Sequence, residues 1–221
     1  MLFSAELDNL DLLKHKYYRA WEEGLLSKSD LKEYACQYFN HVNETPRYLS
    51  TMHANCDDIS VRQVILDNLV DEEKGEENHP ELWLRFCDAL GVKRDVVKSA
   101  KLTECTKNLS STFFALANNS VAEGLGALYA YERQIPSVAK TKIKSLKDLY
   151  GVDSEDALKF FDVHIGADEW HSKECEDLIK KLSAQDQKKA KDAAVKLAKA
   201  LWSFLDGMEE LRITKSYPNA A

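Results

Sequence analysis

The sequence is poor in the residues that interrupt helices. Its 221 residues include only eight glycines and four prolines, and strand-like alternation of apolar and polar residues is scarce. Apolar residues recur instead at three- and four-residue spacing over long stretches. We therefore predict an all-α protein, a bundle of about seven main helices. There is no repeat or linker, so residues 1–212 are expected to form one domain, followed by a flexible tail at 213–221.

Other absences narrow the class of protein. The net charge is −7, which argues against nucleic-acid binding through a basic surface. No apolar run is long enough to cross a membrane, and the N-terminus lacks a secretory pattern. The five cysteines are scattered, without a CxxC pair, as is typical of reduced thiols. We expect a cytoplasmic protein, with no nucleic acid or membrane as partner, whose lysine-rich final helix presents a solvated face.

Caps and prolines predict where several helices begin and end. Apolar spacing over Leu7–Trp21 predicts one helix, and Ser27 and Asp30 form a capping-box pattern for a second helix ending near His41. Pro46 is expected to lie in the first turn of a separate helix. Pro136 is expected to kink or interrupt the helical pattern of residues 121–150.

One helical face carries an unusual polar centre. Its side chains recur at steps of 3, 4, 3, 4 and 3 residues, and the face is apolar at both ends: Phe161, His164, Asp168, His171, Cys175 and Leu178. Buried polar groups are costly unless they are paired or bound to a metal. Imidazole and carboxylate are common ligands of iron, manganese and zinc. The alternative is that the two histidines are solvated or hydrogen-bonded core residues.

Two further segments place a carboxylate in register with an apolar stripe. Glu72 prolongs the inner stripe of the 59–73 helix, although Glu73 is a rival because it is in register with other leucines. Glu132 prolongs the stripe of the 121–135 helix in the same way. His79 follows Glu72 by seven residues, across an irregular turn that can still present a ligand.

These residues form a candidate set of three carboxylates and three imidazoles. This set suits two metal ions of the iron or manganese type, with positions left for water and dioxygen, whereas one structural zinc would need only four ligands. A ferritin-like bundle is the nearest alternative, but it needs two Glu-x-x-His pairs. The chain has one, Glu76–His79, in a poor helix, and a near-copy, Asp168–His171.

Three segments that contain these residues resemble a known superfamily: DNLVDEEKGEENHPELW, ALYAYERQIP and HIGADEWH. They are similar to the heme-oxygenase-like di-metal oxidases, in the PqqC/TenA-like branch that includes a chlamydial protein associating with death domains. KHKYYRAW and HANCDD fit the same alignment, which runs from about Leu10 to Leu205. The resemblance implies a heme-oxygenase-like fold, and it favours Glu72 over Glu73.

The resemblance also implies the ligands and cofactors. The six metal ligands would be Glu72, His79, Glu132, His164, Asp168 and His171. The cofactors would be two metal ions, iron–iron or manganese–iron, with dioxygen and an external reductant, and relatives suggest a homodimer. Because the ligand set is complete, a metal-free PqqC-like or thiaminase-like activity is disfavoured. A heme oxygenase using His15 as the haem ligand is disfavoured because the polar cluster would crowd the haem pocket.

The branch implies synthesis of p-aminobenzoate for folate, in which the protein sacrifices one of its own tyrosines. Alignment assigns Tyr18 as the sacrificed ring and Lys142 as the amino donor. Tyr131, beside Glu132, is a candidate radical relay or supporting donor. His15, Tyr34 and His41 are candidate pocket residues.

Two other functions stay open from the sequence. A dimetal oxidase could act on a separate small molecule, with Tyr18 only lining the pocket. Alternatively, the chain could be a binding module for a host death-domain protein, pairing an acidic surface with a basic one.

Overall fold

The computed structural model describes the backbone of residues 5–216 and the side chains of residues 6–166 and 170–214. Within this range the chain forms helices without strands, as predicted. The elements are α1 (Ala5–Asn9), η1 (Leu12–Lys14), α2 (Lys16–Glu22), α3 (Lys28–Ala54), α4 (Ile59–Glu73), α5 (His79–Ala89), α6 (Arg94–Lys98), α7 (Glu104–Asn119), α8 (Val121–Glu132), α9 (Ile135–Tyr150), α10 (Glu155–Lys181) and α11 (Ala184–Ser216).

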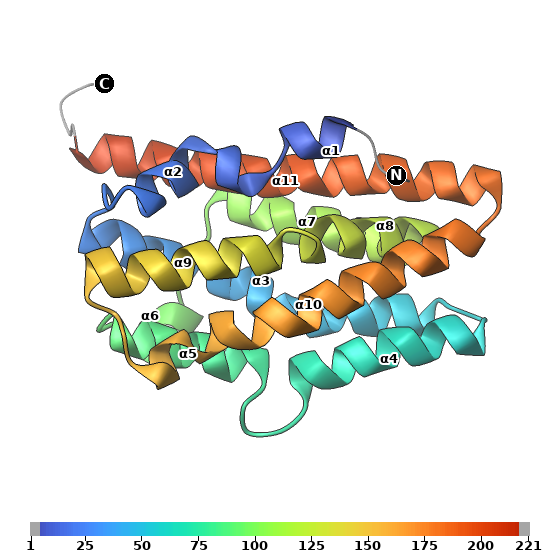
Figure 1. The fold of residues 1–221 in the computed structure, drawn as a ribbon, viewed down its shortest axis with the longest axis horizontal. Helices are drawn as coiled ribbons and strands as arrows, with labels where there is room; N and C mark the ends of the chain where they lie inside the picture. The colour runs from blue at the N-terminus through green and yellow to red at the C-terminus, as the bar shows by residue number, and fades with distance from the viewer. Residues whose placement is uncertain (1–4, 217–221) are drawn as a thin grey trace.

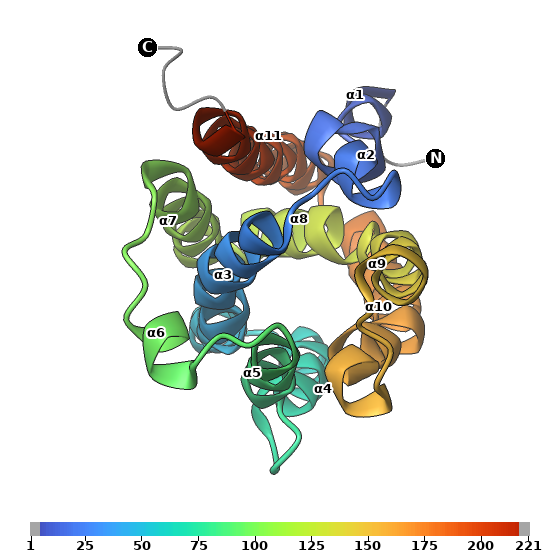
Figure 2. The same cartoon turned by 90° about the vertical axis from the view of Figure 1, so that its left-hand side faces the viewer.

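The long helices surround a shared core. Viewed along the bundle, α3, α5, α4, α10, α9 and α8 form a ring, and α11 lies outside it (Figure 2). Helix α11 runs along α7 and α8, while α10 crosses the molecule and contacts α4, α5, α8 and α9 (Figure 1). Eight helices in the described range are longer than ten residues, close to the seven expected. Helix α10 therefore contacts each of the three other helices that carry candidate ligands.

The prediction of a helix break at Pro46 is wrong. The capping box of Ser27 and Asp30 forms, with Asp30 N donating to Ser27 Oγ at 3.2 Å and Ser27 N donating to Asp30 Oδ2 at 2.8 Å. The helix then continues through Pro46 to Ala54. Val42 and Leu49, on either side of the proline, are both buried in the core. This packing outweighs the one backbone hydrogen bond that the proline removes.

The N-terminal segment is also less regular than predicted. The expected helix over Leu7–Trp21 is divided into α1, η1 and α2. Asp11 caps η1, because its side chain accepts from Leu13 N, and His15 caps α2, because its Nδ1 accepts from Tyr17 N at 3.0 Å. Such side-chain caps compete with helix continuation.

Two helix boundaries in the C-terminal half of the chain test the predictions for Pro136 and for the C-terminal tail. Helix α8 ends at Glu132 and α9 begins at Ile135, so Pro136 interrupts the pattern as expected. Helix α11 continues to Ser216, so residues 213–216 of the predicted tail are helical. The rest of that tail lies outside the described residues.

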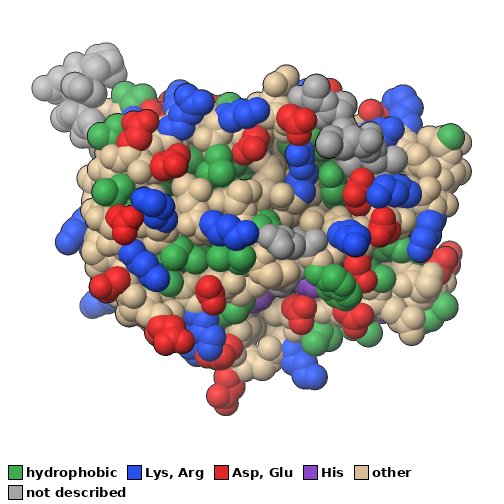
Figure 3. Space-filling view, in the orientation of Figure 1, with side chains coloured by type: hydrophobic (Ala, Val, Ile, Leu, Met, Phe, Trp, Pro, Cys, Tyr) green, Lys and Arg blue, Asp and Glu red, His purple; other side chains and the backbone are tan. Residues whose placement is uncertain are grey.

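The surface agrees with the charge pattern of the sequence. Basic and acidic side chains are interspersed over one face of the molecule (Figure 3). Lys188, Lys189 and Lys199 each pair with a carboxylate, as expected for a solvated helix face. None of the described helices is long and apolar enough to span a membrane.

Close packing of α8 on α11 leads to a prediction about stability. A Cβ atom at Gly126 would collide with the backbone of Ala190, whereas one at Gly166 would meet no atom within 4 Å. We expect Gly126→Ala to lower the free energy of unfolding by about 1–3 kcal/mol, because backbone cannot move aside easily. The control, Gly166→Ala in α10, should be neutral or stabilising by up to about 1 kcal/mol. Urea denaturation measures both, and equal stability of the two variants would contradict this packing.

Candidate metal centre

Three side chains of ligand type converge from three different helices. Glu72 lies at the end of α4, His79 at the start of α5, and His164 near the middle of α10. All three are buried, and one donor atom of each lies within 4.8 Å of those of the other two. Their arrangement is therefore compatible with a single metal ion.

The connection between α4 and α5 explains how Glu72 and His79 meet. The chain turns at Gly75, where φ is +88°, a backbone conformation that favours glycine. Asn78 then caps α5, since its side chain accepts from Glu81 N. Glu77, between them, forms an ion pair with Lys159 of α10 at 2.6 Å. The irregular turn thus presents His79 to Glu72, as the sequence predicted.

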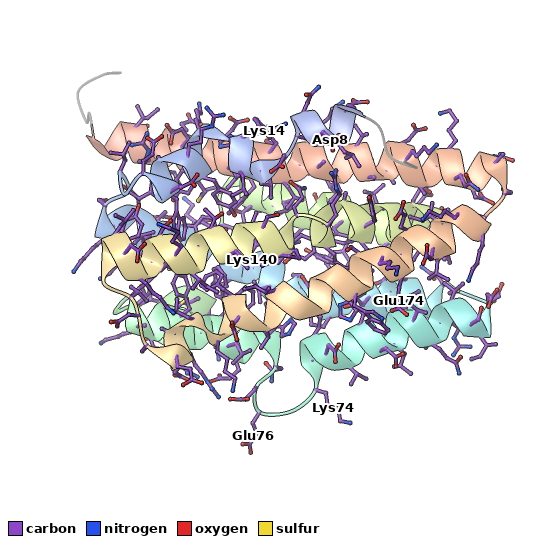
Figure 4. All side chains as sticks on the ribbon, viewed as in Figure 1. Asp8, Lys14, Lys74, Glu76, Lys140 and Glu174 are labelled. Carbon is purple, nitrogen blue, oxygen red and sulfur yellow. The ribbon has the colours of Figure 1, made fainter. Side chains whose placement is uncertain are left out.

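The alternatives to Glu72 face solvent. Glu73 and Glu76 are both exposed, and Glu76 points away from the bundle at the α4–α5 loop (Figure 4). A ferritin-like Glu76–His79 pair therefore does not form.

The contact between Glu72 and His79 is close but poorly aligned. Glu72 Oε2 lies 2.8 Å from His79 Nδ1, yet this nitrogen makes no hydrogen bond of acceptable geometry. Burial would raise the pKa of Glu72 and lower that of His79, but their mutual attraction outweighs it: the pKa of Glu72 is lowered and that of His79 is raised. A buried nitrogen without an aligned partner fits a metal ligand.

His164 is prepared to act as a neutral ligand. Its Nδ1 faces the carbonyl oxygen of Phe160 at 2.5 Å, so this nitrogen carries the proton and Nε2 keeps its lone pair. Burial, and then the nearby His79, lowers the pKa of His164 to about 4. The imidazole is therefore neutral near pH 7.

Two other predicted ligands, Glu132 and His171, contact residues outside the Glu72–His79–His164 set. Glu132 is 3% exposed and accepts hydrogen bonds from Asn68 and Cys175. Burial is the main cause that raises its pKa to about 8, and the negative charge of Glu72 adds to it. His171 is buried, and its Nε2 lies 3.2 Å from Asp71 Oδ2. The Asp168 side chain lies outside the described residues.

The described donors fit iron or manganese. Carboxylate and imidazole are the donor types that these ions accept, and the convergent set contains no thiolate. Glu72, His79 and His164 lie close enough together to hold one ion. Glu132 and His171 as ligands of a second ion remain a prediction, as does Asp168.

A narrow cavity begins at His164. Its volume is about 20 Å³, room for about one water molecule. Its lining is mainly aromatic and aliphatic: Tyr38, Trp83, Tyr131, Ile135, Val138, Ala139, Lys142, Phe160, Phe161 and His164. The cavity therefore links a candidate metal ligand with the buried amine of Lys142.

Lys142 forms a compact cluster with two of the predicted tyrosines. Tyr34 Oη lies 2.6 Å from Tyr18 Oη and accepts a hydrogen bond from Lys142 Nζ at 2.7 Å. Lys142 Nζ also lies 4.6 Å from the centre of the Tyr18 ring. Burial lowers the pKa of Lys142 well below its usual range and raises that of Tyr18. The tyrosine is therefore a neutral phenol near pH 7, and loss of the lysine's proton is favoured.

The remaining predicted residues have different places. Tyr131 lines the cavity, and its hydroxyl lies 3.2 Å from that of Tyr38. The His41 ring is perpendicular to that of Tyr131, with 4.8 Å between ring centres. His15 does not line this cavity: besides capping α2, it faces Asp206 at 3.2 Å. His15 thus holds the helix that carries Tyr18. Tyr34 and His41 do not line this cavity either, which corrects the prediction of all three as pocket residues.

Sequence reasoning gave no role to two residues that contact the site, Asn68 and Cys175. Their signal was nevertheless present in the spacing. Asn68 precedes Glu72 by one helical turn, and Cys175 follows His171 by one turn. Each therefore lies on the same helix face as a predicted ligand.

Comparisons with known proteins agree with the fold and with the use of a metal. The family of iron-containing redox enzymes matches residues 32–204. A 4-aminobenzoate synthase of Nitrosomonas europaea is 40% identical over 224 residues, covering 94% of this chain and 91% of that protein. One from Chlamydia muridarum is 39% identical over 207 residues, covering 93% and 88%.

Solved structures support the fold. A Shewanella denitrificans domain of unknown function with a heme oxygenase-like fold superposes with a TM-score of 0.80 at 15% identity, covering 97% of this chain and 91% of that one. A TenA homologue from Pseudomonas syringae gives 0.76 at 18% identity, covering 93% and 90%.

The fold and the buried donors thus define a heme-oxygenase-like, metal-using oxidoreductase. The chain belongs to the family of iron-containing redox enzymes, and the resemblance found in the sequence is confirmed.

Metal binding should depend on pH through Glu132. Without metal, burial raises the pKa of this carboxyl to about 8, so it holds a proton near neutral pH, and the raised pKa of His79 acts in the same direction. An incoming ion must displace the Glu132 proton. We expect the Mn²⁺ affinity to rise from about pH 6.5 to about pH 8.5, with proton release. Calorimetric titration in buffers of different ionisation enthalpy measures both, and an affinity that is flat across this range would contradict the assignment.

Proposed function

We propose that the chain is a dimetal oxygenase that makes p-aminobenzoate from its own Tyr18, with Lys142 as the source of nitrogen. The metal ions would be iron–iron or manganese–iron, held by Glu72, His79, Glu132, His164, Asp168 and His171. When bound, they would activate dioxygen with electrons from an external reductant. The observation that carries the proposal is the Tyr18–Tyr34–Lys142 cluster beside a cavity that reaches His164.

The carbon skeleton of the product supports Tyr18 as its source. A tyrosine side chain has seven carbons, the six of the ring and Cβ, and p-aminobenzoate has the same number in the same para arrangement. Breaking the Cα–Cβ bond of Tyr18 would leave Cβ as the carboxylate carbon. At the opposite end of the ring, Nζ of Lys142 would form the new C–N bond as the phenol oxygen leaves as water, and the Cε–Nζ bond of the lysine would then have to break. Dioxygen would be the oxidant of Cβ and the source of the carboxylate oxygens.

The position of Lys142 suits the second of these changes. Its amine lies over the Tyr18 ring and shares the Tyr34 hydroxyl with the Tyr18 phenol. Only a neutral amine is a nucleophile, and burial favours the neutral form. The Tyr34 hydroxyl is thus within hydrogen-bonding distance of both the Tyr18 oxygen, which would leave the ring, and the Lys142 nitrogen, which would replace it.

The aromatic lining supports isolation of this chemistry from water. Tyr131 and Tyr38 line the same cavity as His164, and the ring of Tyr34 stacks on that of Tyr38 with 5.4 Å between centres. This contact supports Tyr131 as a relay or supporting donor. The two relatives at 39% and 40% identity are 4-aminobenzoate synthases, which supports the same product here.

A separate substrate is the second candidate. The cavity of about 20 Å³ that reaches Lys142 is too small for a separate aromatic molecule, which favours self-sacrifice. More than one product molecule per chain would support the separate substrate instead. The homodimer, the death-domain partner and the cytoplasmic location stay predictions.

Substitution of the sacrificed ring is the direct genetic test. We expect Tyr18→Phe to abolish p-aminobenzoate, because the ring loses the para oxygen that nitrogen replaces, while metal content stays unchanged. Tyr17→Phe is the matched control, since Tyr17 is an adjacent buried tyrosine whose hydroxyl donates to the carbonyl oxygen of Asp30. Product is measured by chromatography after reaction of the metal-loaded protein with dioxygen. Wild-type yield from Tyr18→Phe would refute the proposal.

We expect Lys142 to be required for product formation and to lower the free energy of unfolding. Because burial lowers the pKa of Lys142 in the folded chain, the unfolded chain binds the lysine proton more tightly than the folded chain does. At pH 7 the lysine therefore destabilises the fold. This effect fades as the pH rises toward the ordinary pKa of lysine. Lys142→Met should abolish product and raise the free energy of unfolding by about 0.5–2 kcal/mol.

The control for this prediction is Lys140→Met, an exposed lysine on the same helix (Figure 4). It should change stability by less than about 0.5 kcal/mol and leave product yield unchanged. Urea denaturation at pH 7 and product assays measure both variants. A Lys142→Met protein with full yield would exclude this lysine as the nitrogen source.

A further inference from the structure

Glu132 is held at both carboxylate oxygens by residues outside the predicted ligand set. Asn68 Nδ2 donates to Oε1, and Cys175 Sγ lies 3.7 Å from Oε2 as a donor. Asn68 is 4% exposed and Cys175 is 2% exposed. Both contacts are therefore formed away from solvent, where a hydrogen bond strongly limits the orientation of a carboxylate.

The two donors come from the helices that carry other ligands. Asn68 lies one turn before Glu72 in α4, and Cys175 lies one turn after His171 in α10. Glu132 itself ends α8. These two hydrogen bonds thus fix the position of the Glu132 carboxylate of α8 relative to α4 and α10, which carry other predicted ligands.

The contacts leave part of the carboxylate available. An ionised carboxylate offers about four acceptor positions over its two oxygens, and the amide and thiol occupy one on each. Each oxygen keeps one position for an ion. A carboxylate with both oxygens free to ligate is suited to bridging two ions, but only if its rotation is restricted. Hydrogen-bond partners of this kind orient ligands and tune affinity in known metal sites.

We infer that Asn68 and Cys175 are positioning residues that fix the Glu132 carboxylate for metal binding. This inference rests on the proposed dimetal centre. A different, purely structural role would be to connect α4, α8 and α10. The two roles predict different effects of substituting Asn68 or Cys175. If they position Glu132, substitution changes the affinity and geometry of metal binding in the folded protein. If they only connect the helices, substitution changes only stability.

The test uses full-length metal-free protein and Mn²⁺ as the probe. We expect Asn68→Leu and Cys175→Ala each to weaken Mn²⁺ binding by about 10-fold or more, most strongly for the second ion. Cys175→Ser keeps a donor at the same position and should bind within about threefold of wild type. The absorption bands of the Co²⁺-loaded protein should shift in Cys175→Ala and return toward wild type in Cys175→Ser.

Two substitutions control for burial and helix contacts. Cys87→Ala removes a fully buried thiol in α5 that faces a backbone carbonyl. Asn40→Leu removes an amide that donates to Ser110 between α3 and α7. Both should bind Mn²⁺ like the wild type. Circular dichroism of each metal-free variant establishes folding, and if Asn68→Leu does not fold, the Cys175→Ala and Cys175→Ser pair decides the question.

The outcomes separate this inference from the proposed centre. Wild-type protein that binds about two Mn²⁺ per chain, with equal affinity and unchanged Co²⁺ bands in folded Cys175→Ala and Asn68→Leu, overturns the positioning role and leaves the metal centre standing. A wild-type chain that binds no Mn²⁺ or Co²⁺ overturns the metal centre and this inference together. Loss of affinity in Cys175→Ser as large as in Cys175→Ala also overturns it, because the retained donor should suffice.

Discussion

The burial of carboxylate and imidazole groups inside an otherwise apolar bundle is the constraint on which the rest of the structure depends. A buried charge without a partner is strongly destabilising, and here each group has a specific means of avoiding that state. Glu72 lies against His79, His164 is neutral, and Glu132 has a pKa raised to about 8. The packing of α4, α5, α8 and α10 brings these groups together, so the metal-free cluster is tolerable yet ready to exchange protons for ions.

Lys142, which lines the same cavity as His164, presents the complementary case. Its amine is surrounded by aromatic rings, and its described hydrogen bond is to the neutral hydroxyl of Tyr34. Such an environment costs stability, and because burial lowers the pKa of the amine it favours the neutral, nucleophilic form. Under the proposed function, the metal cluster would supply the oxidising centre, Lys142 the nitrogen and Tyr18 the benzenoid ring, all from one chain.

Helical periodicity predicted a large part of this arrangement. It placed Glu72 and Glu132 on inner faces, and the buried Glu72 beside the exposed Glu73 shows why a step of one residue decides burial on a helix. It missed the continuity of α3 through Pro46, because packing outweighs one lost hydrogen bond. It could not show that Asp71 faces His171, since pairing between helices depends on their relative placement rather than on spacing within one chain segment.

The central claim is that the chain converts its own Tyr18 into product. The most direct measurement is mass spectrometry of protein containing ring-labelled tyrosine, loaded with iron and manganese, before and after reaction with dioxygen and a reductant. Our account predicts labelled p-aminobenzoate at no more than one molecule per chain, matched by loss of the seven side-chain carbons from position 18 alone. Labelled product with an intact Tyr18, or unlabelled product in excess of the chain, would contradict it.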